Sequence, residues 1–412
     1  MIDCIIIGGG PAGLMAAGTV AEAGKKVLVL EKMDKPCLKL GITGKGRCNL
    51  ANINETKELL KQFNSGKRFL KYALHEFSNH DLMQFFETKG VKLKVERGNR
   101  VFPASGKAFQ IVGALKDWCR SLKVEVKTRV HIQKIITKHN LVTGVVFIEK
   151  REEKLVKCQN LIIATGGKSY PQTGSTGDGY EMAKRLGHKI IKPKPSLVPL
   201  FTENKTHVLD NLKLKNVNIT LKQEGKKICE KFGELYFTDF GIDGPVTLTI
   251  SNYAIKQLMT VGKVNISIDL KPGLSHKQLK NRLIREISDK KNRNLRDVVY
   301  QLLPVILANY CLKELQLPIN KKCTEITAEE RQKIRIWLKE FTVQITGYKP
   351  LEDGIVTAGG INLKEIDSTT MRSKIIYNLI FAGEILDVDA QTGGYNLQAA
   401  FSTGYVAGKS IN

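Results

Sequence analysis

The chain has 412 residues and a formal net charge of +25, from 65 Lys and Arg against 40 Asp and Glu. With 42% hydrophobic residues and only 12 Pro, the composition excludes disordered, collagen-like and mucin-like proteins. The length predicts about two to three domains of ordinary size. The basic residues are interspersed along the whole chain, which favours a solvated surface over a dedicated nucleic-acid-binding arm.

The eight cysteines are too sparse for a disulfide framework, and none stands in a Cys-x-x-Cys pair or in a Cys/His spacing that binds metal. We therefore expect a reducing compartment and no metal site. Asp3 stands where a secretory signal would carry positive charge, and no run reaches the roughly 18 apolar residues of a membrane span. The sequence predicts a cytoplasmic protein without a membrane partner.

The N-terminus shows the pattern of a strand, a glycine turn and a helix. Residues 2–7 are apolar and β-branched, and an Ala-rich helical stretch begins at Leu14. Between them Gly8, Gly10 and Gly13 satisfy the G-x-G-x-x-G spacing. The first glycine permits the tight turn, the second lets the backbone approach a pyrophosphate, and the third lets the helix pack on the strand. The pyrophosphate is expected on the helix N-terminus, which favours anions.

A second parallel strand is predicted at residues 26–30, and Glu31 ends it. Glu31 follows Gly13 by 18 positions, close to the spacing of the acidic residue that binds a ribose 2′-hydroxyl. A 2′-phosphate at this position would be repelled by the carboxylate. The site therefore favours the adenosine of FAD or NAD over that of NADP.

Two further segments suit contact with a bound dinucleotide. Residues 43–49 form a glycine-rich polar loop whose backbone can approach a ligand closely. Residues 160–167 form an apolar strand that runs into Thr-Gly-Gly, after β-rich stretches at 124–130 and 142–148 that indicate a small meander. Taken alone, the first is equally an ordinary turn and the second an ordinary buried strand.

A third such segment lies near the C-terminus. Residues 378–384 form a strand that ends in Ala-Gly-Glu, and glycines at 393–394 open a helix of small residues. The N-terminus of this helix suits a flavin, because the helix dipole stabilises negative charge that develops at N1 and O2 when N5 accepts hydride. A purely structural helix start is the alternative.

The middle of the chain does not alternate strands and helices. Apolar residues at period two, at 217–221 and 264–270, predict an antiparallel β module, and helical spacing begins near Ser275. Thr327 and Glu330 form a capping box that opens a later helix. No second glycine fingerprint follows a strand in residues 190–345. A nicotinamide would therefore have to dock transiently, and oxygen is the alternative electron acceptor.

Long motifs along the whole chain resemble those of the flavoprotein family that includes BaiN-type proteins and aminoacetone oxidases, within the glutathione-reductase-like FAD superfamily. They are GGGPAG, TGKGRCNLAN, ATGGKSYPQTGSTGDGY, GELYFTDFGIDGP, TAGGI, TMRSK and FAGEILDVDAQTGGYNLQAAFSTG. The resemblance implies an α/β fold with a Rossmann-like FAD-binding domain at 1–190 and 343–412, interrupted by the β module at 191–272 and a helical cap at 273–342.

The resemblance also implies how FAD is held. Arg47, Cys48 and Asn49 would line the flavin, Glu31 and Lys32 the adenosine ribose, Val130 the adenine and Lys39 the pyrophosphate, while the residues from Gly383 to Gln398 would embrace the ribityl chain and isoalloxazine. Cys37, where the family usually has Gly, and Lys45, which interrupts a glycine run, depart from the pattern. The full set expected to bind FAD is Gly8, Gly10, Pro11, Ala12, Gly13, Glu31, Lys32, Lys39, Leu40, Thr43, Gly44, Gly46, Arg47, Cys48, Asn49, Val130, Ala164, Thr165, Gly166, Gly383, Glu384, Gly394, Asn396, Leu397 and Gln398.

The chemistry belongs to the flavin, so the protein has only to orient a substrate and manage a proton. Candidate proton-handling residues are Tyr170, Asp178 and Tyr395, and Lys45 is a candidate to stabilise negative charge; for each of them a role as a structural loop or cap residue is favoured. Cys48 has no resolving cysteine nearby, which favours a packing role over a redox role.

Three functional hypotheses follow. The first is an FAD-dependent oxidoreductase that acts on a small molecule, either as an NAD(P)H-linked C=C reductase or as an amine oxidase that uses oxygen. The second is an RNA-modifying flavoprotein, suggested by FAD together with the charge of +25. The third is a redox sensor that binds FAD without turnover. The sequence favours a small-molecule substrate over nucleic acid and leaves the oligomeric state open.

Overall fold

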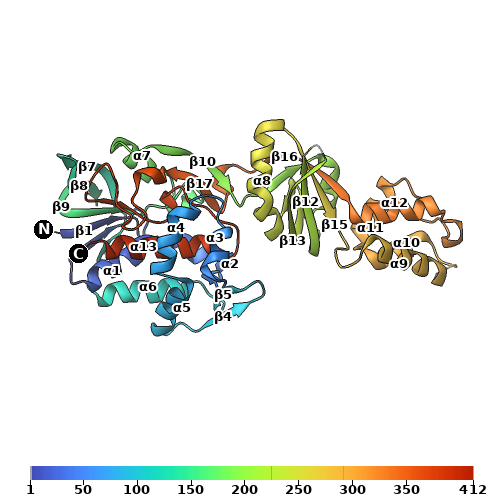
Figure 1. The fold of residues 1–412 in the computed structure, drawn as a ribbon, viewed down its shortest axis with the longest axis horizontal. Coiled ribbons are helices and arrows are strands. Elements are labelled where there is room, and N and C mark those ends of the chain that lie inside the picture. Colours follow the sequence, from blue (N-terminus) through green and yellow to red (C-terminus); the bar gives the residue numbers. More distant parts are fainter. Residues whose placement is uncertain (1, 224, 291, 412) are drawn as a thin grey trace. The chain divides into compact units, whose positions relative to one another are not determined.

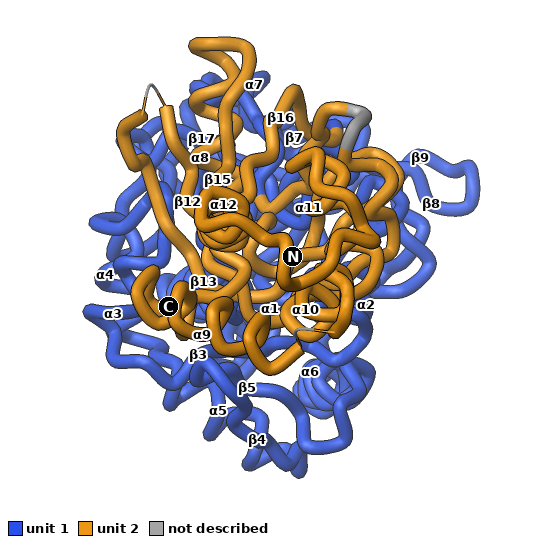
Figure 2. The backbone as a smooth tube through the Cα atoms, turned by 90° about the vertical axis from the view of Figure 1, so that its right-hand side faces the viewer, with its two compact units in different colours: residues 1–196, 350–412 blue, residues 197–349 orange. Residues whose placement is uncertain are grey.

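The computed structural model describes residues 2–223, 225–290 and 292–411. The chain divides into two compact units, which Figure 2 shows in separate colours. Unit 1 comprises residues 1–196 and 350–412, and unit 2 comprises residues 197–349. Each unit has its own hydrophobic core of buried aliphatic and aromatic residues. The predicted α/β fold class is confirmed, since a Rossmann-type sheet stands beside separate antiparallel sheets.

Unit 1 is built on a seven-stranded sheet in the order β6-β2-β1-β9-β8-β7, with β18 paired to β9. The strands β2, β1 and β18 are short and fully apolar or nearly so, because both faces of a parallel sheet are covered. The bounds are β1 Ile2–Ile7, β2 Val27–Leu30, β6 Glu125–Lys127, β7 His131–Lys138, β8 Leu141–Glu149, β9 Glu152–Ile163 and β18 Leu379–Phe381.

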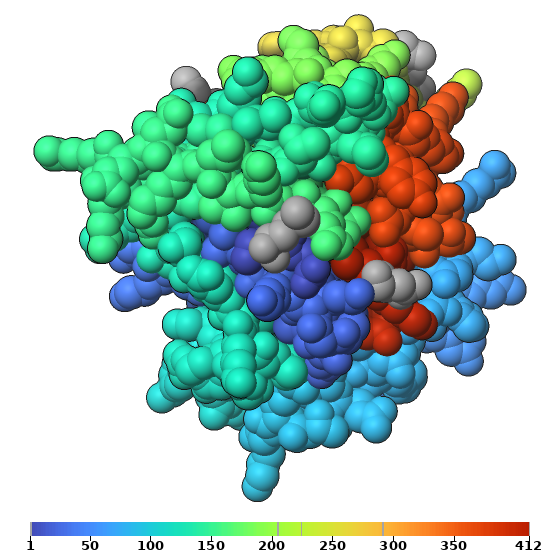
Figure 3. Space-filling view, turned by 90° about the vertical axis from the view of Figure 1, so that its left-hand side faces the viewer, coloured from blue at the N-terminus to red at the C-terminus, as the bar shows by residue number. Residues whose placement is uncertain are grey.

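The sheet joins segments that are far apart in the sequence. Strand β1 pairs in parallel with both β2 and β9, and β9 pairs in parallel with β18. Figure 3 shows the N-terminal segment in blue, the β7–β9 region in green and the C-terminal segment in red side by side on one face. The carboxyl ends of these parallel strands therefore meet at one edge, which is where ligands bind in such sheets.

The expected meander exists but is built differently. Residues 125–127 form β6, a parallel edge strand beside β2, and not the first strand of the meander. The meander consists of β7, β8 and the first part of β9, all antiparallel. Strand β7 contains only exposed and half-buried residues, without regular alternation, which explains why its weak hydrophobic pattern gave no strand prediction.

The helices of unit 1 surround this sheet, and α1 packs against both α13 and α6 (Figure 1). Two small sheets accompany them, β3-β5-β4 and β10-β17. The helices are α1 Pro11–Glu22, α2 Leu38–Gly46, α3 Thr56–Lys61, α4 Lys67–Glu76, α5 Asn79–Thr88, α6 Phe109–Ser121, α7 Asp178–Arg185 and α13 Tyr395–Lys409. The small strands are β3 Ala51–Asn52, β4 Leu93–Glu96, β5 Arg100–Pro103, β10 Ile190–Ser196 and β17 Val356–Ile361.

Unit 2 contains a closed antiparallel barrel in the order β11-β14-β13-β12-β15-β16. The apolar residues predicted to alternate in β12 and β15 are buried inside it. The helix α8, Pro245–Val261, packs on the barrel and was not predicted. The strands are β11 Leu200–Thr202, β12 Lys213–Gln223, β13 Lys226–Thr238, β14 Gly241–Asp243, β15 Val264–Asp269 and β16 Phe341–Tyr348.

Four further helices follow β15, namely α9 His276–Asp289, α10 Leu295–Leu302, α11 Val305–Glu314 and α12 Ala328–Lys339. The predicted capping box at Thr327 and Glu330 is confirmed at the start of α12. After these helices β16 returns to the barrel and pairs with β15 and β11. The boundary expected after residue 342 thus falls inside β16, and the β module and the helices belong to one unit.

Three properties concern the whole described chain. None of its helices combines the length and the apolar character that crossing a membrane requires. All eight cysteines are free, and seven of them are buried. In the ranges 2–223, 225–290 and 292–411, three or more His, Cys, Asp or Glu side chains nowhere gather in a way that could hold a metal ion.

Candidate functional site

The glycine turn between β1 and α1 is closely packed at two of its three fingerprint glycines. A Cβ on Gly8 would lie 2.5 Å from the Ala164 carbonyl oxygen, and one on Gly13 would lie 1.9 Å from the Gly8 carbonyl oxygen. Both positions therefore require glycine for backbone packing. Gly10, in contrast, faces open space. It is the N-cap of α1, and no side chain caps this helix, which Pro11 begins.

Glu31 lies directly after β2 and is 9% exposed. One carboxylate oxygen accepts a hydrogen bond from the Gly9 backbone N–H at 2.6 Å, and the other accepts one from the Met33 N–H at 2.8 Å. Burial raises the pKa of Glu31, and these two hydrogen bonds offset only part of the effect. Val130, which donates its backbone N–H to the Glu31 carbonyl, is buried beside it. The carboxylate thus lies next to the glycine turn.

Lys39, in α2, and Glu384, just after β18, form an ion pair that joins these two segments. The Lys39 ammonium lies 2.8 Å from Glu384 Oε2 and 2.7 Å from Ser169 Oγ. The Thr357 backbone N–H donates to Glu384 Oε1 at 2.8 Å. Ser169 and Thr357 were not predicted as site residues, although both stand in the quoted motifs ATGGKSY and TAGGI. The network fixes the segments that follow β9 and β18.

The loop at residues 43–49 is tightly turned. Gly44, Lys45, Gly46 and Cys48 all have positive φ values, so the backbone is coiled in a way that exposes N–H groups. Lys45 is exposed. Arg47 forms an ion pair with Glu96 and lies 4.4 Å above the centre of the Phe102 ring.

Cys48 in this loop is fully buried. Burial raises the pKa of its thiol to about 12, opposed only by a hydrogen bond with Thr43. The thiolate, which is the reactive form, is therefore absent at neutral pH. This agrees with a packing role for Cys48. Cys37, at the other family departure, also has a positive φ and is buried, and its thiol donates to the Gly9 carbonyl at 3.4 Å.

The segment after β9 and the turn after β18 approach the glycine turn from two sides. The Ala164 backbone N–H donates to the Ile7 carbonyl at 2.8 Å, and Gly166 has a positive φ. The Gly383 N–H donates to Thr403 Oγ1 at 2.9 Å. A Cβ on Gly383 would lie 2.8 Å from the Cβ of Ala12. The predicted segments at 8–13, 164–166 and 383 are thus neighbours.

The helix α13 begins at Tyr395 after the N-cap Gly394, which lies against the Ala51 carbonyl. The Asn396 side chain is occupied, because it accepts from the Ala390 N–H and donates to the Ala390 carbonyl. The Gln398 amide donates to the Phe77 carbonyl at 3.2 Å, away from the helix N-terminus. Leu397 is half-buried. The roles of these three in holding the isoalloxazine stay predictions.

Two of the predicted proton-handling residues have other partners. Asp178 forms an ion pair with Lys32 at 2.7 Å and accepts from Thr176. Burial acts to raise the pKa of Asp178, but the bonds from Lys32 and Thr176 outweigh it and lower the pKa. Tyr170 has a positive φ, and its backbone N–H donates to the Glu352 carbonyl at 3.1 Å. The candidate proton-handling roles of both residues stay predictions.

Two buried polar atoms indicate that these segments hold a ligand. Asn49 Oδ1 and Thr165 Oγ1 are buried and have no hydrogen-bond partner in the described protein. Such atoms are costly unless something else satisfies them. They stand in two segments that the sequence predicts to contact FAD, and the uncapped N-terminus of α1 at Gly10 is open. The residues present therefore fit a dinucleotide, whose pyrophosphate would lie at Gly10 and whose ribose would lie at Glu31.

A comparison with protein-family models decides the family. The model described as HI0933-like protein Rossmann domain matches residues 2–410. The chain belongs to this family. The expected resemblance to BaiN-like FAD-binding flavoproteins is confirmed, and the HI0933-like chain is an FAD-dependent oxidoreductase.

Related proteins match the HI0933-like chain over nearly its whole length. It is 32% identical to a ribosomal RNA dihydrouridine synthase of Haemophilus influenzae, over 99% of this chain and 98% of the relative. It is 26% identical to a 3-dehydro-bile acid delta(4,6)-reductase of Clostridium scindens, over 98% of each chain. The crystal structure of a 3-ketosteroid-delta4-(5alpha)-dehydrogenase from Rhodococcus jostii matches with a TM-score of 0.57 at 13% identity, over 100% of this chain and 96% of that one. That likeness shows the fold alone.

Proposed function

We propose that this oxidoreductase reduces a carbon–carbon double bond next to a carbonyl group, and that its substrate is a uracil base in RNA. The observation that carries the proposal is the 32% identity to a ribosomal RNA dihydrouridine synthase along 99% of this chain. Dihydrouracil differs from uracil by one hydride and one proton added across the ring double bond. The 26% identity to a delta(4,6)-reductase supports the same type of reaction.

The net charge of +25 gains a function under this proposal. From the sequence alone, the even distribution of the basic residues along the chain favoured a solvated surface over nucleic-acid binding. An RNA substrate brings phosphates that Lys and Arg neutralise with release of counterions, so distributed basic residues support affinity. The proposal therefore gives nucleic acid more weight than the charge distribution by itself did.

When bound, FAD supplies the hydride chemistry. The chain's own residues hold the cofactor and provide a proton. The α1 N-terminus at Gly10 would receive the pyrophosphate, and Glu31 would receive the adenosine ribose. Asn49 and Thr165, whose buried oxygens lack partners in the described protein, would be available to hydrogen-bond to the cofactor.

We assign the proton to Tyr395, the first residue of α13. Its side chain is 7% exposed. Burial raises the pKa of Tyr395, although the neighbouring Asn54 side chain acts in the opposite direction. The hydroxyl is therefore protonated throughout the physiological range and serves as a donor rather than as a base.

NADH or NADPH is the proposed source of electrons. Every pairing between strands of the unit 2 barrel is antiparallel, so this barrel is not a nicotinamide-binding Rossmann domain. A nicotinamide would therefore dock transiently and leave before the RNA base binds. This order predicts two separable half-reactions.

The experiment incubates purified, FAD-loaded protein without oxygen, together with NADH or NADPH and protein-free ribosomal RNA. Nucleosides from the digested RNA are then analysed by mass spectrometry for dihydrouridine. The matched control is Tyr395→Phe, which should retain FAD and be reduced by the nicotinamide but form little dihydrouridine. Bleaching by an amine with recovery in air, and no dihydrouridine, would contradict the proposal and favour an oxidase. Reduction of a steroid enone but not of RNA would support the proposed type of reaction and refute RNA as the substrate.

A further inference from the structure

Unit 1 contains a surface cavity of about 560 Å³, and none of its lining residues belongs to the set expected to bind FAD. The size lies within the range of about 300–1,000 Å³ that is usual for ligand pockets. Its walls come from the segment after β9, from α7 and from β10. The lining residues include Lys168, Tyr180, Lys184, His188, Lys189 and Lys192.

The cavity is strongly cationic. Four lysines line it, and none of their ammonium groups forms an ion pair within the described residues: Lys168, Lys184, Lys189 and Lys192. Of the two carboxylates in its lining, Asp178 is already paired with Lys32 and Glu181 is the other, while the Glu365 carboxylate contacts His188 from outside the lining. Burial lowers the pKa of His188, and the Glu365 side chain that contacts it opposes this only in part, so this histidine is neutral at physiological pH.

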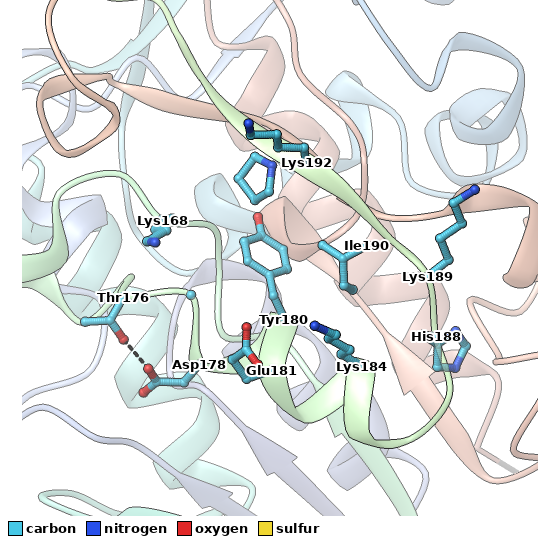
Figure 4. Close-up of a pocket in the computed structure, with 12 residues that line it drawn as sticks. Lys168, Thr176, Asp178, Tyr180, Glu181, Lys184, His188, Lys189, Ile190 and Lys192 are labelled. Carbon is cyan, nitrogen blue, oxygen red and sulfur yellow. Dashed lines mark hydrogen bonds between the residues drawn. The ribbon is translucent and has the colours of Figure 1, made fainter.

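A buried hydroxyl at the same place lacks a partner. Tyr180 is 4% exposed, and its OH has no hydrogen bond in the described protein. Figure 4 shows the ring standing among the lysines, with the hydroxyl on the side of Lys192. Burial raises the pKa of Tyr180, with Glu384 and Asp387 adding to the effect. The Tyr180 hydroxyl is therefore a hydrogen-bond donor without an acceptor, and an anionic oxygen would satisfy it.

The lysines do not converge on one point. In Figure 4 the four ammonium groups lie apart, around Tyr180 and along β10. A single small anion would be held by ammonium groups that meet at one place. Divergent groups suit a ligand with several phosphates along its length, and such spacing is typical of grooves that follow a single-stranded backbone.

We propose that this cavity binds consecutive phosphate groups of an RNA strand. Lys184, Lys189 and Lys192 neutralise the phosphates, and the Tyr180 hydroxyl donates a hydrogen bond to a phosphate oxygen. The proposal rests on the proposed function in taking RNA as the ligand, but it concerns binding and not turnover.

The test measures binding of a fluorescein-labelled, single-stranded RNA of about 12 nucleotides to the FAD-loaded protein by fluorescence anisotropy. The variant Lys184→Gln/Lys189→Gln/Lys192→Gln is compared with Lys57→Gln/Lys67→Gln/Lys71→Gln. The control lysines are exposed, lie on α3 and α4 and likewise form no ion pair in the described residues. Both variants change the net charge equally, so long-range attraction is matched.

We expect the cavity variant to bind RNA at least about tenfold more weakly and to lower the magnitude of the salt slope by about two, from about 0.7 per lost phosphate contact. The control variant should bind like the parent. Tyr180→Phe should weaken binding by about tenfold, the effect of one hydrogen bond to a charged group. Equal loss in both lysine variants would overturn the proposal, because only overall charge would then matter.

Competition separates other ligands from RNA. NADPH, inorganic phosphate and poly-glutamate are added to the parent complex at equal ionic strength. Strong displacement by NADPH would assign the cavity to a dinucleotide, and equal displacement by poly-glutamate would assign it to polyanions in general; either result overturns the proposal. RNA binding through these lysines without dihydrouridine formation would refute the proposed function alone. Dihydrouridine formation with an unchanged KM in the cavity variant would refute the cavity alone.

Discussion

Replacing Glu31 tests how the chain holds the adenosine end of its cofactor. Each oxygen of this buried carboxylate already accepts one backbone N–H, from Gly9 at 2.6 Å and from Met33 at 2.8 Å. Since a carboxylate oxygen has two lone pairs, both oxygens can still accept a ribose hydroxyl. Glu31→Gln keeps the shape but leaves one accepting oxygen, while Glu31→Ala removes both.

The size of the effect follows from these contacts. A hydrogen bond to a charged group contributes about 1.5–3 kcal/mol, and a neutral one about 0.5–1.5 kcal/mol. Glu31→Gln should therefore weaken FAD binding by about tenfold, and Glu31→Ala by about 100-fold, at about 1.4 kcal/mol for each tenfold. Either variant also leaves at least one backbone N–H, that of Gly9 or Met33, without its acceptor, which costs about 1–3 kcal/mol.

The assay titrates FAD into the apoprotein variants and follows flavin fluorescence, with thermal unfolding measured in parallel. The control is Glu22→Gln, because the Glu22 carboxylate accepts from Trp118 Nε1 at 3.0 Å at the far end of α1. This variant should lose stability without losing FAD affinity. Glu31→Ala with the parent affinity for FAD would refute the assignment of Glu31 to the ribose.

Three further predictions test other parts of the account. Gly10→Ala should have a free energy of unfolding within about 0.5 kcal/mol of the parent, since its Cβ meets nothing within 4 Å, but it should bind FAD at least about tenfold more weakly. Gly13→Ala should instead lose about 3 kcal/mol of stability. Equal unfolding curves for the two variants would contradict this difference. Tyr395→Phe should leave reduction by nicotinamide unchanged and slow dihydrouridine formation by about 100-fold in single-turnover experiments; slowing of both half-reactions would instead indicate a structural role. Burial lowers the pKa of His188 below 6.5, so below about pH 6.5 the unfolded chain binds a proton that the folded chain does not bind. The free energy of unfolding should therefore fall as the pH drops from 7 to 5. This pH dependence should be weaker in His188→Gln, and an unchanged dependence would show that other groups cause it.

Local motifs in the sequence predicted the nucleotide-binding turn well. Gly8 and Gly13 must be glycines because other backbone segments of the parallel sheet and the turn come close to them. These contacts recur wherever a strand, a glycine turn and a helix bind a dinucleotide, so the spacing of a few residues is sufficient to predict them. Strands and caps with their own signal, such as the alternating residues of β12 and β15 or the box at Thr327, were predicted for the same reason. Their physical cause is local in the chain.

Other features depend on contacts that the sequence does not show. The barrel closes only because β16 pairs with β11, two strands separated by the whole of unit 2. The helix α8 could have been found, since Val246, Ile250, Ala254 and Leu258 are buried at intervals of four. The Asn396 and Gln398 side chains bond to Ala390 and Phe77, and the unpaired Tyr180 hydroxyl depends on burial by segments distant in the chain.

The central claim is that the reduced flavoprotein reduces uracil in RNA, and one single-turnover measurement tests it without a nicotinamide. The FAD-loaded protein is reduced chemically in the absence of oxygen and mixed with protein-free ribosomal RNA, while the flavin absorbance is recorded and the RNA is digested for mass spectrometry. The account predicts that the flavin is reoxidised by the RNA and that one dihydrouridine forms for each flavin reoxidised. A flavin that stays reduced in the presence of RNA, with no dihydrouridine formed, would contradict it.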